Sequence, residues 1–148
     1  MFASTLVAAA VGLLACGDDQ DPDEAKALLE QVRADDYTSW ARAPGFESRK
    51  PTNAPHADQV EIFVNDVVVE ALSTDGLTAW PEGSVIVKDG YDDDGTHALV
   101  AIMEKRSDGW FWAEYDAESG ESKYSGKPGI CIDCHDAGDD DVRAFSLP

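Results

Sequence analysis

The sequence predicts an α+β fold, mainly β, in which N-terminal helices precede a small antiparallel sheet and a C-terminal loop. Three observations carry this prediction. Apolar residues recur with a helical period in residues 24–34, and β-branched and aromatic residues form strand-like runs between residues 60 and 115. A cysteine–histidine motif then lies close to the C-terminus. The 148 residues suit one domain with a hydrophobic core of its own.

The first residues indicate export. Residues 2–15 are apolar or small and too short to span a bilayer, so we interpret residues 1–15 as a signal peptide. They lead into Leu-Leu-Ala-Cys-Gly, residues 13–17, which resembles the cleavage box of bacterial lipoproteins, although no basic residue precedes it. We therefore expect lipid on Cys16 and a protein anchored to a membrane facing the periplasm; a simple secretory signal is the alternative.

The charge of the chain is strongly acidic. The formal net charge is −19, and no charged residue lies before Asp18, so all of it belongs to the mature part. Nucleic-acid binding is excluded in practice, because no basic surface could follow a phosphate backbone. The acidic surface steers basic partners or cationic small molecules, or simply keeps an exported protein soluble. Residues 16–24 form an acidic tether, and residues 25–148 form the predicted domain.

Two helices are expected at the start of the domain. Asp23 is the predicted cap of a helix over residues 24–34, whose apolar stripe is Leu28, Leu29 and Val32. A second, short helix is expected over residues 37–41. We expect Trp40 and Phe46 to seal these helices against the sheet.

Strands and turns alternate through the middle of the chain. The predicted strands are 60–64, 84–88, 96–106 and 110–115, and the predicted loops are 48–57, 89–95 and 118–129. The centre of the third strand is apolar on both faces, so both faces should be covered. Residues 67–72 are ambiguous: three valines favour a strand, whereas Asn65 or Asp66 as an N-cap favours the short helix that we predict.

The motif that organises the C-terminal region is Cys131-Ile-Asp-Cys134-His135. This spacing is the attachment signature of c-type haem: the two thiols form thioethers with the porphyrin vinyl groups, and the histidine ligates iron. A thioredoxin-type cysteine pair would require a βαβ context, and a zinc site would require a second ligand pair. The sequence supports neither, so we predict one covalently bound haem c with His135 as the iron ligand.

The second axial ligand is the next question. Only thirteen residues follow His135 and none is methionine, while Met103 lies in an apolar strand pattern where a core role is expected. A bis-histidine haem would need His56 or His97, each a lone histidine. Elimination favours a five-coordinate iron with an open face, which suits ligand binding or chemistry.

At this point the chain resembles the cytochrome P-460 family, from residue 37 to residue 135. The resembling segments are Val64-Asn65-Asp66, Trp-Pro-Glu-Gly-Ser-Val-Ile-Val-Lys at 80–88, Gly-Trp-Phe-Trp-Ala-Glu-Tyr at 109–115, Gly126-Lys127 and the haem motif. The resemblance implies a mainly β, usually dimeric, periplasmic haem c fold, shared with the β-sheet type of cytochrome c′. It implies oxidation of hydroxylamine, as in the enzymes of the family, or binding of nitric oxide, as in sheet cytochromes c′.

The resemblance also gives Lys88 a role, because the family's enzymes join the lysine at this position to a meso carbon of the haem. Strand alternation puts Lys88 on the face of Ile86. Turnover would need a distal proton acceptor, for which Glu114 and Glu104 are the candidates. Aromatic side chains could instead cap the distal face and favour gas binding; these are Phe63, Phe111 and Trp112.

Two functions therefore stay open at this stage: a hydroxylamine-oxidising enzyme that passes electrons to an external redox partner, and a gas-binding or electron-transfer cytochrome. The expected partners are a small nitrogen ligand or substrate and a second copy of the chain.

Overall fold

The computed structural model describes residues 20–148 and confirms an α+β fold that is mainly β. The helical segments are α1 (Pro22–Ala34), the 3-10 helix η1 (Tyr37–Ser39), α2 (Asp66–Ala71) and α3 (Gly129–His135). The strands are β1 (Ala41–Arg42), β2 (Lys50–Pro51), β3 (Gln59–Val64), β4 (Val85–Tyr91), β5 (His97–Arg106), β6 (Gly109–Asp116) and β7 (Ser122–Gly126).

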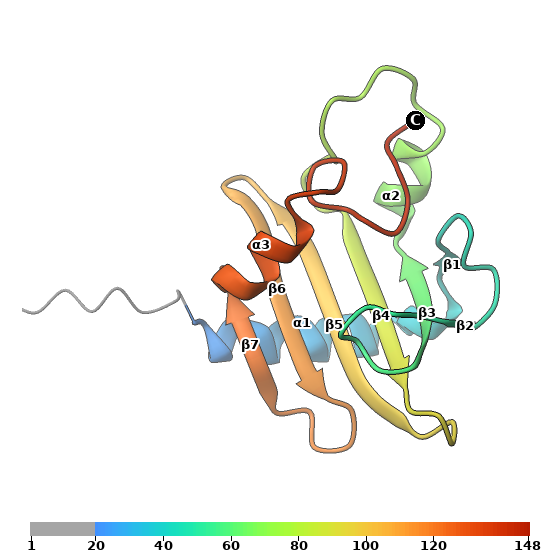
Figure 1. Ribbon diagram of the computed structural model, residues 1–148. Helices are drawn as coiled ribbons and strands as arrows, with labels where there is room; N and C mark the ends of the chain where they lie inside the picture. The colour runs from blue at the N-terminus through green and yellow to red at the C-terminus, as the bar shows by residue number, and fades with distance from the viewer. Residues whose placement is uncertain (1–19) are drawn as a thin grey trace, which may run out of the picture.

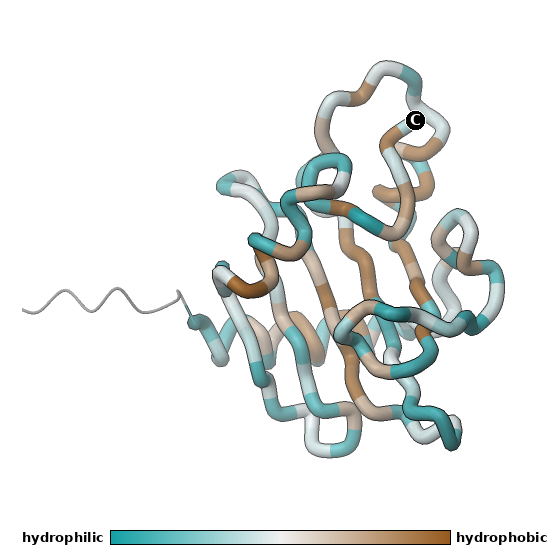
Figure 2. The backbone as a smooth tube through the Cα atoms, viewed as in Figure 1, coloured by the Kyte–Doolittle hydropathy of each residue, from teal (hydrophilic) through white to brown (hydrophobic). Residues whose placement is uncertain are grey.

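All these strands form one antiparallel sheet in the order β1-β3-β4-β5-β6-β7, with β2 also paired to β3. Figure 1 shows α1 lying across one face of the sheet and α3 on the opposite face. The long central strands are the apolar part of the molecule, while the hairpin tips are hydrophilic (Figure 2). The sheet thus separates two layers, each closed by a helix from a different end of the chain.

Strand β5 is covered on both faces, as its apolar centre predicts. Val100 and Ile102 belong to a cluster with the buried residues of α1, whereas Met103 belongs to a second cluster under α2 and the C-terminal segment. Burial of a large aliphatic side chain contributes roughly 1.5–3 kcal/mol, so each cluster stabilises one layer substantially. We refer to these two surfaces as the α1 face and the α3 face of the sheet.

Helix α1 begins two residues earlier than predicted. Asp21, not Asp23, is the N-cap: its side chain accepts a hydrogen bond from the Glu24 backbone N–H at 3.1 Å, and Pro22 occupies the first turn. The tether predicted for residues 16–24 therefore ends before Pro22. The backbone N–H of Asp21 donates to Ser125 Oγ at 3.0 Å, which ties the start of the helix to β7.

The short elements near α1 and α2 follow the predictions in part. The predicted helix at 37–41 is only the single turn η1, and Ala41 already belongs to β1. Trp40 and Phe46 pack against the cores but are only half-buried. The helix predicted over 67–72 is confirmed as α2, because the Asn65 side chain caps it by accepting from the Val68 N–H.

Four segments predicted as loops contain regular structure, and the first is the predicted loop 48–57, where Lys50–Pro51 pair with β3 as β2. Strand β4 continues through Asp89 to Tyr91, because the buried Asp89 carboxylate accepts a hydrogen bond from the Tyr37 hydroxyl at 2.9 Å and pairs with His97 at 3.2 Å. Strand β7 forms inside the predicted loop 118–129; it lies at the sheet edge, where polar residues are tolerated. The predicted haem loop begins with helix α3.

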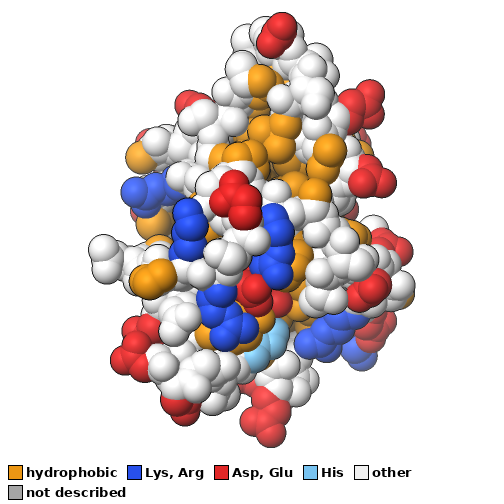
Figure 3. Space-filling view, turned by 90° about the vertical axis from the view of Figure 1, so that its right-hand side faces the viewer, with side chains coloured by type: hydrophobic (Ala, Val, Ile, Leu, Met, Phe, Trp, Pro, Cys, Tyr) orange, Lys and Arg blue, Asp and Glu red, His pale blue; other side chains and the backbone are white. Residues whose placement is uncertain are grey.

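The predicted signal peptide, the lipidation site Cys16 and most of the tether lie outside the described residues. Within residues 20–148, no helix is both long and apolar enough to cross a membrane. Figure 3 shows one flank of the molecule, where hydrophobic side chains gather in the upper half and acidic side chains are spread around the outline.

Candidate functional site

The site lies on the α3 face, where sheet register places chemically distinct side chains in one row. Lys88 on β4 pairs with Ala101 on β5, Ala101 pairs with Glu114 on β6, and Glu114 pairs with Tyr124 on β7. Residues paired across an antiparallel sheet project from the same face. The row borders two adjoining hollows of about 200 and 440 Å³, which share Pro55, His56, Ile86, Lys88, Met103, Cys134 and His135.

Helix α3 carries both cysteines and the histidine of the haem motif. Cys131 and Cys134 are three residues apart, which puts their thiols on one side of a helix. Both line the smaller hollow; Cys131 is partly buried, Cys134 is exposed, and neither forms a disulfide. Burial raises the pKa of the Cys131 thiol to about 11, helped by the charges of Glu114 and Cys134. Their spacing and their place at an apolar hollow fit thioether attachment.

His135 is oriented by a backbone carbonyl. Its Nδ1 lies 2.8 Å from the carbonyl oxygen of Asp141, which can only accept, so Nδ1 carries the proton and Nε2 keeps its lone pair. Burial lowers the pKa of His135 to about 4, which keeps the ring neutral. Trp112 packs edge-on against the ring with centroids 4.6 Å apart. A neutral imidazole with a fixed tautomer and a free Nε2 is what iron ligation requires.

The loop that orients His135 is itself fixed by three side chains, one from the segment before β4 and two from strands β5 and β6. Trp80 Nε1 donates to the Asp139 carbonyl, Trp110 Nε1 donates to the Asp140 carbonyl, and Lys105 Nζ binds the Asp140 carboxylate at 2.7 Å. Asp140 and Asp141 have positive φ angles of 48° and 66°, a conformation that needs such support. These contacts aim the Asp141 carbonyl at His135.

Lys88 lies where alternation predicts, on the face of Ile86 and opposite Val85 and Val87. It lines both hollows close to Cys134 and His135. Burial lowers the pKa of Lys88 from 10.5 to about 8, while the neighbouring Cys134 and Glu114 partly oppose this effect. Lys88 is still mostly protonated at pH 7, but a larger fraction of its amine is neutral than in a surface lysine, which makes it the better nucleophile.

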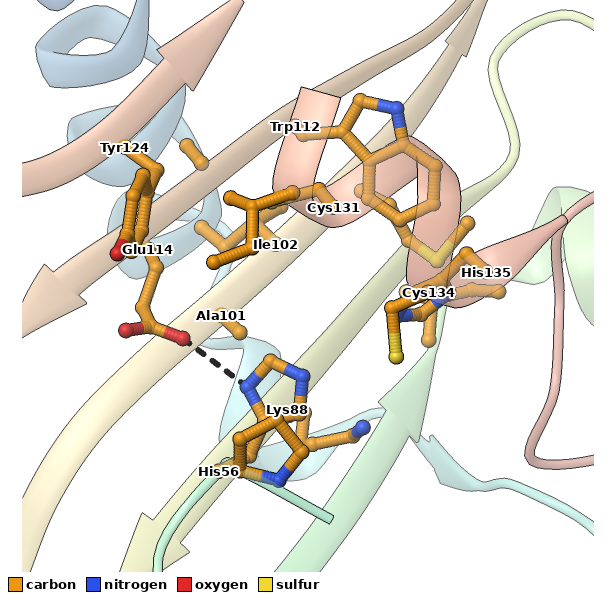
Figure 4. Close-up of a pocket in the computed structure, with 15 residues that line it drawn as sticks. His56, Lys88, Ala101, Ile102, Trp112, Glu114, Tyr124, Cys131, Cys134 and His135 are labelled. Atoms are coloured by element: carbon orange, nitrogen blue, oxygen red, sulfur yellow. Dashed lines mark hydrogen bonds and ion pairs between the residues drawn. The ribbon is translucent and has the colours of Figure 1, made fainter. Parts of the chain in front are cut away.

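The structure separates the two carboxylate candidates. Glu114 lines the hollow, and its Oε2 accepts a hydrogen bond from Nδ1 of His56 at 3.0 Å (Figure 4). Glu104 lies on the α1 face, as its shared face with Val100 and Ile102 implies, and it pairs with Arg106 at 2.7 Å. Glu104 is therefore wrongly placed to act in the hollow, because the whole sheet stands between them.

The remaining candidates divide in the same way. Phe63 and Phe111 pack in the α1 cluster, so of the three aromatic candidates only Trp112 reaches the site. His97 stacks on Tyr91 at the far end of β4 and pairs with Asp89. Met103 is buried but borders both hollows. His56 is the residue that sequence reasoning undervalued: nothing in its loop indicated that it meets Glu114, 58 residues further on.

An antiparallel sheet that presents a cysteine pair, an oriented neutral histidine and an apolar hollow defines a haem-binding cytochrome. The family model for Cytochrome P460 matches residues 34–143, most of the chain, and the chain belongs to the cytochrome P460 family. A comparison with curated proteins finds no match. The donor set fits the haem that the family implies, because two thiols three residues apart on α3 and an imidazole with a fixed tautomer border one apolar hollow.

Proposed function

We propose that the protein carries one haem c, attached covalently through Cys131 and Cys134, with His135 as the iron ligand from the protein on the α3 side. The orientation of His135 by the Asp141 carbonyl supports this proposal, because it leaves Nε2 free while the ring stays neutral. The apolar side chains around the cysteines would exclude water from the macrocycle; they include Ile86, Ile130, Met103 and Trp112.

We further propose that the protein oxidises hydroxylamine at the haem that Cys131, Cys134 and His135 would hold. When bound, haem would accept the electrons that hydroxylamine loses, and an external redox partner would reoxidise it. The chain supplies the proton acceptor: Glu114 and His56 lie side by side at the hollow, hydrogen-bonded at 3.0 Å. A carboxylate–imidazole pair can take a proton at His56 and stabilise the resulting charge through Glu114.

The position of the Lys88 amine at the hollow is the single observation on which the enzyme proposal depends. The amine borders the same hollow as both cysteines, and its lowered pKa raises the share of the neutral, nucleophilic form above that of an ordinary lysine. We propose that Lys88 Nζ replaces the hydrogen on a meso carbon of the haem, as in the enzymes of the family. A C–N bond would form while one N–H and one C–H bond break, and a two-electron oxidant of the peroxide class would take up the two electrons and the two protons. Such a bond would distort the macrocycle and change its electronics.

The apolar lining of the hollow favours a second candidate function, the binding of nitric oxide without turnover. Small uncharged gases enter apolar pockets readily, whereas hydroxylamine needs hydrogen-bonding partners. An unlinked Lys88 and a Glu114 without effect on turnover would support this alternative, and electron transfer alone would be a third role for the same haem.

The test is a digestion of the mature protein followed by mass spectrometry. We expect a haem peptide that joins the Cys131–Cys134 fragment to the Lys88 fragment. Haem on the cysteine fragment alone would remove the basis of the enzyme proposal and favour gas binding. Hydroxylamine consumption in the presence of an oxidant should exceed that of the Lys88→Arg variant; equal rates would count against turnover.

We propose in addition that the protein is exported, anchored by lipid at Cys16 on a membrane facing the periplasm, and paired with a second copy of itself. The leader and lipoprotein-like box in residues 1–17 support the anchor, and periplasmic export supports haem attachment. Labelling with a radioactive fatty acid should mark the wild-type chain but not Cys16→Ser.

A further inference from the structure

The rings of His56 and His135 border the same hollow, with their centroids 6.4 Å apart. We propose that His56, held by Glu114, is the sixth ligand of the haem iron in the resting protein, and that a small nitrogen ligand must displace it to bind. This inference rests on the haem attachment at α3 proposed above. It changes the expectation of an open distal face into that of a face closed by a removable side chain.

The separation of the two rings is the first argument. The ring centroids of His56 and His135 are 6.4 Å apart, with an angle of 72° between their planes. Two imidazoles bound to one metal at bond lengths of about 2 Å place their ring centres about 6 Å apart. A histidine that only donated a hydrogen bond to an iron-bound molecule would lie farther away, at roughly 8 Å. The observed spacing matches direct ligation.

The hydrogen bonds of the two rings are the second argument. His135 Nδ1 donates to the Asp141 carbonyl at 2.8 Å, and His56 Nδ1 donates to Glu114 Oε2 at 3.0 Å. Both rings therefore keep Nε2 as the nitrogen with a free lone pair, and each has the outer partner that fixes a metal-bound imidazole. In Figure 4 the His56 ring lies between Glu114 on one side and Cys134 with His135 on the other.

The position of His56 in the chain explains how it could leave. Residues 52–57 carry no regular structure between β2 and β3, and the loop is closed at its base by the Thr52 N–H donating to the Asp58 carbonyl at 2.9 Å. The side chain of His56 is partly buried, with 17% of its surface exposed. Release of His56 thus requires rearrangement of one short loop, whereas the loop that orients His135 is held by Trp80, Lys105 and Trp110.

The alternative sixth ligands are less well placed. Met103 projects from the rigid centre of β5, packed within the buried cluster of the α3 face, and has no mobile segment. Lys88 is committed to the haem edge in the proposed enzyme. His97 is bound to Asp89 and Tyr91 away from the hollow, so His56 is the one histidine of residues 20–148, besides His135, that borders it.

The test compares absorption and electron paramagnetic resonance spectra of the mature haem-loaded protein with those of two matched variants. We expect low-spin ferric haem in the wild type and in His97→Asn, and high-spin haem in His56→Asn. Added imidazole should return His56→Asn to low spin. A high-spin wild type with an unchanged spectrum in His56→Asn would overturn the inference.

Ligand binding gives a second readout, which is measured on the wild type itself and therefore does not depend on a variant that folds well. If His56 closes the face, nitric oxide or carbon monoxide should bind the ferrous wild type at a rate that levels off at high gas concentration, and His56→Asn or Glu114→Gln should bind on the order of tenfold faster. A rate that rises linearly with gas concentration in the wild type would overturn the inference. The proposed function fails separately, through absent hydroxylamine consumption or a missing Lys88 link, since neither outcome changes the spin state expected here.

Discussion

The buried amine of Lys88 makes a quantitative prediction about the haem-free chain. The fold lowers the pKa of Lys88 from 10.5 to about 8, so the folded chain binds a proton here less tightly than the unfolded chain. At pH 7 both states are largely protonated, and the difference costs the fold about 3 kcal/mol of its free energy of unfolding. Lys88→Met keeps most of the side-chain volume and removes the charge, so it should recover much of that cost.

The sign of the pH dependence is the sharper part of this prediction. The loss in the free energy of unfolding caused by Lys88 is present in full below pH 8, decreases as the pH rises from about 8 to 10.5, and is absent above pH 10.5. The advantage of Lys88→Met over wild type should therefore be largest at pH 7 and lose about 3 kcal/mol by pH 10.5, whatever constant packing difference the methionine adds.

Denaturant titration of the haem-free chain at a series of pH values is the assay. Lys123→Met is the matched control, because Lys123 is exposed on β7 and its replacement should change stability by less than about 0.5 kcal/mol. If the difference between wild type and Lys88→Met stays constant from pH 7 to 10.5, the burial of a costly charge at Lys88 is refuted, and with it the argument for an activated amine.

Three further substitutions test the scaffold. Asn65→Ala removes the cap of α2 and the hydrogen bonds to Gly83 and Val85, so chemical denaturation should show a loss of about 2–3 kcal/mol; a loss under 1 would contradict the capping role. Tyr115→Phe removes the hydroxyl that donates to the buried Ala25 carbonyl at 2.6 Å and should cost about 1–2 kcal/mol in the same assay, while an unchanged midpoint would show that the bond contributes nothing. Gly90→Ala would place a Cβ 2.8 Å from the His56 carbonyl oxygen, so the loop should shift and the haem spectrum should move toward high spin; a wild-type spectrum would argue against the close approach.

The sequence predicted most of the strands because their faces differ so clearly. Alternation placed Lys88 with Ile86 and placed Glu104 with Val100 and Ile102, and the structure confirms both assignments. Periodicity alone, however, does not say which face carries the haem motif. That depends on the direction in which the chain crosses the sheet after β7, so Glu114 and Glu104 were equivalent until the structure separated them.

The errors arose where tertiary contacts override local preference. Asp89 is typical of a turn, yet inside β4 its carboxylate accepts a hydrogen bond from the Tyr37 hydroxyl and pairs with His97. Ser122–Gly126 has too few apolar residues to indicate a strand, and it forms because β6 offers an unpaired edge. The contact of His56 with Glu114 depends on how a loop packs over a strand that is distant in the sequence, and a local sequence pattern does not predict such a contact.

The order of the strands has a consequence for how the chain reaches its folded state. Strands β4, β5, β6 and β7 follow one another in the sequence and pair neighbour to neighbour, so this part of the sheet needs only short loop closures and can form rapidly. Contacts between residues far apart in the sequence, such as that between Gln20 and Ser125, carry a larger loop-closure cost. Helix α3 is the next element after this meander. The haem motif therefore follows all four strands along the chain, and the sheet surface that borders the hollow can already be assembled when the thiols reach it.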